Sequence, residues 1–161
     1  MKTIPLTKGY VAQVDDEDYP WLAEYNWQAH VVQGGKYVYA QRGIWDRLKR
    51  CVVYSSMHRV ILNAPDDRLV DHKDFNGLNN QKSNLRLTDY SKNRAHCRDR
   101  QSKSGMKGVW WWKARNRWRV SVKVGGKHHY VGIFRDKHAA MAAYDVAAKK
   151  AFGEFAVLNN P

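Results

Sequence analysis

Residues 68–98 read RLVDHKDFNGLNNQKSNLRLTDYSKNRAHCR, and this stretch decides the fold of the middle of the chain. The pattern of Arg68–Asp71 predicts a short strand, and Lys73–Asn84 is a long polar loop rich in Asn and Gly. Leu85–Leu87 predicts a second strand, and the Thr-Asp pair after it is placed to cap a basic helix. The expected order is strand, loop, strand, helix.

Four polar residues fall at defined points in this pattern. Asp71 and His72 end the first strand, Asn84 follows His72 by 12 residues, and Asn93 follows Asn84 by 9. Because side chains alternate along a strand, Asp71 and His72 should point to different sides. One can then hold a metal ion while the other meets a water molecule, as hydrolysis of a phosphodiester requires.

The four residues resemble the HNH endonuclease family. Its ββα-metal motif has Asp-His ending a strand, Asn closing the loop, and His or Asn on the helix that follows. The resemblance covers residues 57–98. It implies that Asp71 and Asn93 ligate the ion, that His72 is the general base, and that Asn84 holds the loop and orients the histidine. Asn at the last position, where many members have His, is a variant of the phage and intron-encoded branch.

The donors implied by the resemblance indicate which ion to expect. Carboxylate and amide oxygens suit Mg²⁺ or Mn²⁺, with water and a phosphate oxygen completing the shell, and no small-molecule cofactor is expected. A calcium loop is excluded, because counting back from Gly77 puts His72 and Ser83 where Asp and Glu are required. His58 and His96 are interpreted as structural or phosphate-contacting residues rather than ligands.

The C-terminal third has a different composition. Residues 99–105 are polar and predict a linker. After it, Val109–Lys113, Trp118–Val124 and His128–Phe134 alternate like three strands, and the glycine pair before the last is typical of a tight hairpin. An alanine-rich helix should follow, between a cap at Asp136 and a stop at the glycine at position 153. The residues expected against this helix are Trp118, Val120, Val122 and Val124, with Trp111 also in the core.

The segments G-M-K-G-V, W-R-V-S-V-K-V, H-Y-V-G-I-F and F-G-E-F-A-V-L-N resemble the AP2 domain, known from plant transcription factors and phage endonucleases. The resemblance implies a three-stranded antiparallel sheet packed on one helix, with the sheet in the major groove of DNA. With the basic helix included, the residues expected to contact DNA are Arg94, Arg98, Lys107, Trp110, Trp112, Arg119, Ser121, Lys123, His128 and Tyr130. Plant members carry arginines where Trp110 and Trp112 stand, so phosphate contacts are expected here more than base readout.

Residues 1–57 are expected to form a small sheet-plus-helix scaffold with no chemistry of its own. The strands expected there are Tyr10–Val14, Tyr37–Gln41 and Cys51–Ser55. Asp15 and Asp16 precede a proline and are interpreted as a helix cap rather than a metal site. A short helix is expected over Met57–Asn63.

The formal charge of +13 is unevenly distributed. Residues 1–57 hold 7 basic and 6 acidic side chains, residues 58–103 hold 10 and 6, and residues 104–161 hold 11 and 3, so the excess rises from +1 to +4 to +8. This favours a polyanionic partner, although a basic protein without one is an alternative. No apolar run of about 18 residues or signal-peptide core is present, so a membrane partner is not expected.

The expected fold class is α+β. The domains predicted are the scaffold over 1–57, the nuclease core over 58–98, the linker over 99–105 and the AP2-like domain over 106–161. Cys51 and Cys97 stand alone, which excludes a disulfide framework and predicts a cytoplasmic location in a bacterial or phage-infected cell.

The function expected is a metal-dependent endonuclease, specifically a homing enzyme, that nicks or cuts double-stranded DNA as a monomer. A DNA-binding regulator without catalysis is the first alternative. An RNA-binding module is the second, because exposed aromatic side chains can stack on bases.

Overall fold

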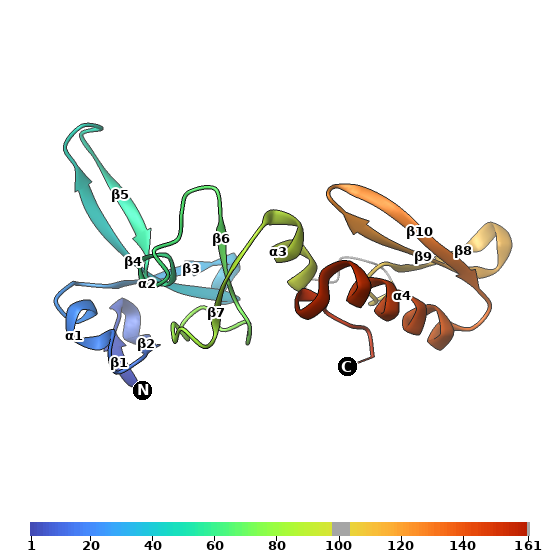
Figure 1. Ribbon diagram of the computed structural model, residues 1–161, viewed down its shortest axis with the longest axis horizontal. Helices are drawn as coiled ribbons and strands as arrows, with labels where there is room; N and C mark the ends of the chain where they lie inside the picture. The colour runs from blue at the N-terminus through green and yellow to red at the C-terminus, as the bar shows by residue number, and fades with distance from the viewer. Residues whose placement is uncertain (98–103, 161) are drawn as a thin grey trace. The chain divides into compact units, whose positions relative to one another are not determined.

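The computed structural model describes residues 1–97 and 104–160 (Figure 1). It combines small antiparallel sheets with few helices, which is compatible with the expected α+β class. The chain divides into two compact units, Met1–Thr88 and Asp89–Pro161, each with its own hydrophobic core. Arg98 and residues 99–103 of the predicted linker lie outside the described residues.

The first unit begins with an antiparallel hairpin. Strands β1 (Lys2–Pro5) and β2 (Val11–Val14) pair along their whole length, and the predicted strand over Tyr10–Val14 is confirmed. The helix α1 (Tyr19–Leu22) is a single turn with a proline at its start. Alternate residues of β2 are buried, so one side of the hairpin faces the core.

A three-stranded sheet follows, in the order β3 (Gln28–Val32), β4 (Tyr37–Asp46) and β5 (Cys51–Ser56). The helix α2 (Met57–Ile61) begins where β5 ends. The two predicted strands and the short helix are therefore confirmed. However, β4 has ten residues, and its second half runs beyond the end of β3.

One hydrophobic cluster joins these elements. Its buried members are Ile4, Leu6, Ala12, Val14, Leu22, Trp27, Ala29, Ala40 and Met57. Leu78, from the long polar loop, packs against the same cluster. The loop is thus attached to the scaffold by burial of an apolar side chain as well as by polar contacts.

The segment that resembles the HNH motif forms β6 (Leu69–His72), β7 (Leu85–Thr88) and α3 (Tyr90–His96), with β6 and β7 antiparallel. The elements follow the predicted order. Asp89 caps α3, because its carboxylate accepts a hydrogen bond from the backbone amide three residues later at 2.8 Å. β6 and β7 belong to the first unit and α3 belongs to the second.

The second unit contains the antiparallel sheet β8 (Val109–Trp112), β9 (Arg117–Val124) and β10 (Lys127–Phe134), with β9 in the middle. The helix α4 (Lys137–Phe152) packs on it. Among the residues that the structure describes, α4 is the longest helix with 16 residues, and no helix is long and apolar enough to cross a membrane. The described 3₁₀ turns are η1 (Thr7–Gly9), η2 (Gln33–Gly35), η3 (Lys113–Arg115) and η4 (Gly153–Phe155).

The capping and packing predictions for the second unit are confirmed with one exception. Asp136 accepts a hydrogen bond from the Ala139 amide at 2.7 Å, and α4 ends at a glycine with a φ of 56°. The buried core residues are Ala95, Met106, Val109, Val120, Val122, Ala140, Tyr144, Ala148, Phe152 and Phe155. The expected burial of Trp111 is wrong: its side chain is 39% exposed and lies edge-on against Trp118, with ring centroids 5.0 Å apart.

The interpretation of Asp15 and Asp16 as a helix cap is also wrong. Asp18 occupies the N-cap position of α1, but its carboxylate accepts a hydrogen bond from the Trp21 indole at 3.3 Å and caps no backbone amide of the helix. The Asp15 carboxylate instead accepts hydrogen bonds from Gln81 Nε2 at 3.0 Å and the Lys82 amide at 2.8 Å. Asp16 pairs with the N-terminal ammonium. The carboxylate of Asp15 is therefore bound by two donors of the long loop and is not used at the start of α1.

Candidate active site

Asp71 and His72 lie at the end of β6, and both are buried, with exposed fractions of 8% and 6%. Their cross-strand partners on β7 are Arg86 and Leu85. The two side chains have different neighbours: Asp71 pairs with Arg86, whereas the imidazole of His72 lies among aromatic rings. Although Asp71 and His72 are adjacent in the strand, their side chains therefore lie in two different environments.

The Asp71 carboxylate is held by Arg86. One oxygen, Oδ2, accepts a hydrogen bond from Arg86 Nε at 2.9 Å and forms an ion pair with Arg86 Nη2 at 2.8 Å. Both side chains are only 10% exposed, so the pair is largely protected from water. An ion pair in such a place fixes the position of a carboxylate.

His72 is surrounded by rings and shielded from solvent. Its ring centroid is 5.0 Å from that of His58 and 6.0 Å from that of Tyr39. Burial lowers the pKa of His72, while the side chain of Asn80 and the nearby carboxylates oppose that shift. The imidazole is thus neutral at pH 7. Its Nε2 atom is buried and has no hydrogen-bond partner among the residues that the structure describes.

His58 is a second histidine at this place, and sequence reasoning assigned it no definite role. It lies in the first turn of α2, with its ring nearly perpendicular to that of His72 at 84°. Burial lowers the pKa of His58 to about 3, with smaller contributions from the charges of His72 and Arg59. The motif M-H-R at the start of the helix gave no signal that this imidazole would contact His72.

Asn84 closes the long loop. Its Oδ1 accepts from the Asp74 amide at 3.1 Å, and its Nδ2 donates to Asp74 Oδ1 and to the Asn79 carbonyl, each at 2.9 Å. Burial acts to raise the pKa of Asp74, but hydrogen bonds from Asn76, Asn79 and Asn84 outweigh it, and the pKa is lowered. The ionised Asp74 is therefore the acceptor around which the loop is arranged.

The loop also fits tightly against β4. A methyl group added at Gly77 would lie 2.4 Å from the Val38 carbonyl oxygen and 2.6 Å from the Tyr39 ring. Only a residue without a side chain allows this approach. Since the Tyr39 ring also contacts His72, the loop, the sheet and the histidine form one packed arrangement.

The N-terminal strands brace the other side of the loop. Gln13 on β2 donates its amide to the Leu78 carbonyl and accepts from the Asn80 amide, both at 2.8 Å. The Lys82 ammonium pairs with Glu17 at 2.7 Å and with Asp18 at 3.0 Å. The segment that sequence analysis described as a scaffold therefore holds the candidate site in place.

Asn93, the predicted second ligand, lies on α3, where its backbone amide donates to the Asp89 carbonyl at 2.9 Å. The sharing of one ion between Asp71 and Asn93 stays a prediction. In the described ranges, no three His, Cys, Asp or Glu side chains gather as a metal site. A bound ion would have to take its ligands from one carboxylate, amide oxygens, water and phosphate. This donor set fits a hard cation such as Mg²⁺.

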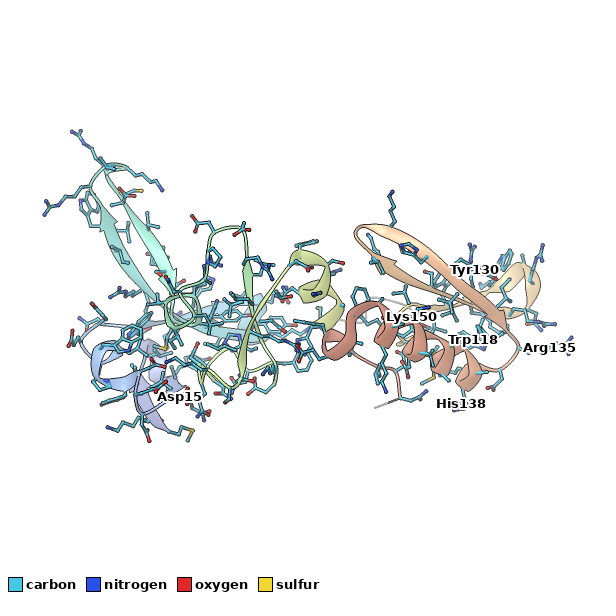
Figure 2. The ribbon with its side chains drawn as sticks, viewed as in Figure 1. Asp15, Trp118, Tyr130, Arg135, His138 and Lys150 are labelled. Carbon is cyan, nitrogen blue, oxygen red and sulfur yellow. The ribbon has the colours of Figure 1, made fainter. Side chains whose placement is uncertain are left out.

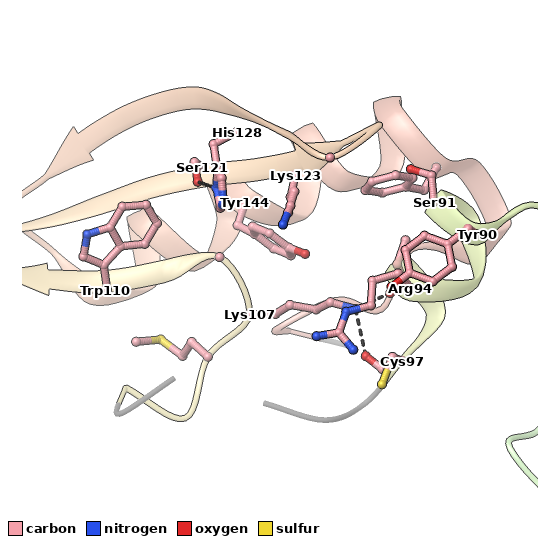
Figure 3. A pocket seen from close by; sticks show the side chains of 15 residues that line it. Tyr90, Ser91, Arg94, Cys97, Lys107, Trp110, Ser121, Lys123, His128 and Tyr144 are labelled. Atoms are coloured by element: carbon pink, nitrogen blue, oxygen red, sulfur yellow. Dashed lines mark hydrogen bonds between the residues drawn. The ribbon is translucent and has the colours of Figure 1, made fainter. Parts of the chain in front are cut away.

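The second unit gathers six of the ten predicted DNA contacts around one hollow of about 650 Å³ (Figure 3). These six are Arg94, Lys107, Trp110, Ser121, Lys123 and His128. Ser121 Oγ and His128 Nδ1 lie 3.3 Å apart at the back of the hollow. Its walls are aromatic and its polar groups are mainly basic, a combination suited to nucleic acid.

Lys107 has a structural role that the sequence did not reveal. Its ammonium donates to the carbonyls of Ala95 and Cys97, at the end of α3, and its backbone is bonded in both directions to the Asn159 side chain. A cation at the C-terminal end of a helix satisfies carbonyls left without a partner in the helix. Lys107 therefore ties α3 to the sheet.

Three further predicted contacts, Arg119, Trp112 and Tyr130, form one cluster together with Trp110. The Arg119 side chain lies over the rings of Trp110 at 5.8 Å, Trp112 at 5.6 Å and Tyr130 at 5.6 Å. Tyr130 is 58% exposed, and it lies on β10 well away from Arg135 at the end of that strand (Figure 2). The tenth predicted contact, Arg98, lies outside the described residues.

No family model matches the chain. The chain is 29% identical over 154 residues to a protein of Acanthamoeba polyphaga mimivirus named as an uncharacterised HNH endonuclease, and the match covers 94% of this chain and 76% of that protein. This relative supports the HNH family. A second similarity, 39% over 66 residues, is to Protein 3.8 of Escherichia phage T7 and covers 40% of this chain and 54% of that protein. The HNH resemblance therefore has support over most of the chain.

Proposed function

We propose that the protein is a metal-dependent DNA endonuclease that hydrolyses phosphodiester bonds through the site at Asp71 and His72. The observation that carries the proposal is a neutral, buried imidazole, whose Nε2 has no hydrogen-bond partner in the described part of the chain, next to a carboxylate paired with Arg86 at the end of one strand. The name of the mimivirus relative supports a nuclease.

His72 is the general base in this proposal. A neutral imidazole takes a proton from water and so makes the water a better nucleophile. Burial keeps the ring neutral, so one of its two nitrogens is an acceptor, and Nε2 would take this role in the tautomer that carries its proton on Nδ1. His58 and Tyr39 confine the ring from two sides, which limits its orientation before the substrate arrives.

Asp71 and Asn93 would hold a Mg²⁺ or Mn²⁺ ion. When bound, the ion neutralises charge that develops on the leaving oxygen. Arg86 fixes Asp71 through a single carboxylate oxygen, and Asn84 keeps the loop closed through Asp74. Each of these residues acts by holding a group in position, and none of them needs to move a proton.

The second unit would bind double-stranded DNA in the manner of the AP2 domain that it resembles. Its excess of +8 charges over residues 104–161 supplies affinity that depends on salt. The Arg119 cluster and the hollow beside it supply aromatic and cationic groups that contact DNA. A site-directed homing enzyme is the form of endonuclease that this arrangement suits best.

A DNA-binding regulator without catalysis is the second candidate. The observation in its favour is the ion pair with Arg86, which already supplies Asp71 with a cationic partner. A regulator would bind the same DNA and leave every strand intact.

Incubation of supercoiled plasmid and phage genomic DNA with the protein and Mg²⁺, followed by mapping of strand ends, tests the proposal. We expect His72→Ala to lower the cleavage rate by about 10² to 10⁴ while gel-shift affinity is kept. His30→Ala, at an exposed histidine on β3, is the matched control. Equal cleavage by the wild type and the His72 variant would overturn the catalytic assignment, and binding without breakage under any divalent ion would favour the regulator.

A further inference from the structure

The distal half of β4 and β5 is a two-stranded ribbon. Pairing of β3 with β4 ends at Gln41, whereas pairing of β4 with β5 continues from Gln41 to Asp46. In Figure 1 this ribbon projects from the rest of the first unit. Residues 42–55 therefore have no third strand beside them and both faces of the ribbon are open.

Apolar side chains cover both faces of the ribbon. One face carries the cross-strand pair Ile44 and Val53, which are 45% and 39% exposed. The other carries Trp45, Val52 and Tyr54, which are 61%, 48% and 59% exposed. A soluble protein rarely leaves so many large apolar side chains on one short element unless they meet a partner.

Gly43 shapes the second face. An added methyl group would lie 2.8 Å from Val52 Cγ1 and 3.6 Å from the Tyr54 ring. The side chains of Val52 and Tyr54 thus lie over the glycine and fill the space that a larger residue would take. The apolar surface is compact, and its width is that of two strands.

The tip of the ribbon is ordered and basic. Asp46 Oδ1 accepts hydrogen bonds from the amides of Leu48 and Lys49 at 2.9 Å and 3.0 Å, which fixes the turn. Leu48, at 97% exposure, points into solvent. Arg47 and Arg50 are exposed beside it. Across residues 42–55, four basic side chains against one acidic side chain leave a charge of +3.

The base of the ribbon is anchored. The Arg42 guanidinium lies over the Tyr25 ring at 3.7 Å and over the Trp27 ring at 5.5 Å. These contacts join the start of the ribbon to the segment after α1, so the projecting part extends from a fixed base.

We propose that this ribbon is a second DNA-contacting arm, which lies in a groove of the duplex. Two-stranded ribbons lie in the major or the minor groove of DNA, and proteins that bend DNA insert apolar side chains as wedges between base steps. Leu48, exposed at the tip, is placed to be such a wedge. The basic tip complements phosphate and opposes pairing of two identical tips. The inference rests on the proposed DNA partner and adds a contact in the part of the chain first described as a scaffold.

The test measures binding of the full chain to a duplex of mixed sequence in EDTA, so that cleavage does not enter. Arg47→Ala combined with Lys49→Ala removes two tip charges, and Lys2→Ala combined with Lys8→Ala is the matched control at exposed positions. We expect the tip variant to lose about tenfold in affinity and to reduce the salt slope by about two, and the control to stay near wild type.

A second variant, Leu48→Ser, tests the wedge. It should shorten the hydroxyl-radical footprint while circular dichroism stays unchanged, because Leu48 contributes nothing to the core. Equal affinity of the tip and control variants would overturn the proposal that the ribbon contacts DNA, and it would leave the proposed endonuclease function unaffected. A change in sedimentation instead of DNA affinity would show that a second copy covers the ribbon. Failure of the wild type to bind duplex DNA would overturn both proposals.

Discussion

The imidazoles of His58 and His72 lie edge to face, with ring centroids 5.0 Å apart and planes at 84°. Burial lowers the pKa of both rings, and the charge of His72 adds to the shift of His58, so both imidazoles are neutral at pH 7. His58 thus confines the ring of the proposed general base by direct contact. It is a positioning residue in this arrangement.

The buried His58 makes the stability of the first unit depend on pH. Its pKa of about 3 in the folded protein is below the ordinary 6.5, so the unfolded chain binds the proton first as pH falls. The free energy of unfolding should therefore fall by up to about 1.4 kcal/mol per pH unit below pH 6.5 on account of this residue. Urea denaturation at pH 7, 5.5 and 4.5 should show a shallower dependence for His58→Gln than for the wild type. His30→Gln, at an exposed position, should keep the wild-type dependence, and an identical slope for all three proteins would contradict the assignment.

Loss of Arg86 should destabilise the first unit and make it responsive to divalent ions. Arg86→Ala removes the guanidinium from a carboxylate that is 10% exposed, and we expect a loss of roughly 3 kcal/mol in the free energy of unfolding. If Asp71 is a metal ligand, Mg²⁺ should restore more stability to this variant than to the wild type, since the ion replaces the lost charge. Arg68→Ala, at an exposed arginine before β6, is the control. No difference in the Mg²⁺ effect among the three would argue against Asp71 as a ligand.

Features that depend on neighbouring residues could be predicted from the sequence. The Asp89 and Asp136 caps, the strands β6 and β7 and the helix α4 all follow from local preferences and periodicity. The alternation in β9 correctly placed Val120 and Val122 in the core. In each of these elements, the local preferences of the residues agree with the fold that the whole chain adopts.

Contacts between distant segments were the part that could not be predicted. Asp15 has the pattern of a helix cap, but its carboxylate binds Gln81 and Lys82, which are 66 and 67 residues away. His58 lies in a helix with no metal-binding spacing, and only the fold brings it to His72. Trp111 alternates like a core residue, yet it lies on an outer strand, where no helix covers it fully.

A methyl group at position 77 should impair both stability and cleavage. Gly77→Ala would place a carbon 2.4 Å from the Val38 carbonyl oxygen and against Tyr39, so the loop or the ring must shift. Overpacking of this kind costs about 1 to 3 kcal/mol, measured as the free energy of unfolding. Because Tyr39 contacts His72, the cleavage rate should fall even where the protein is fully folded. Gly34→Ala meets no atom within 4 Å but strains the backbone, because Gly34 has a φ of 66°. It therefore controls for lost stability, and the cleavage rate of its folded fraction should stay at the wild-type level. Equal rates for the two variants would show that the loop does not position the histidine.

The Arg119 cluster should carry a large share of the DNA affinity of the second unit. Its guanidinium lies over three aromatic rings, which hold an exposed charge at the centre of one sheet face. Arg119→Ala should weaken duplex binding by about tenfold and lower the salt slope by about one. Arg119→Lys should keep most of the salt slope but lose affinity, because an ammonium does not match the planar stacking of a guanidinium. Arg135→Ala removes one exposed arginine at the end of β10 and is the matched control. Fluorescence anisotropy over a range of salt concentrations measures both quantities, and an equal loss for Arg119→Ala and Arg135→Ala would show that the cluster contributes only general charge.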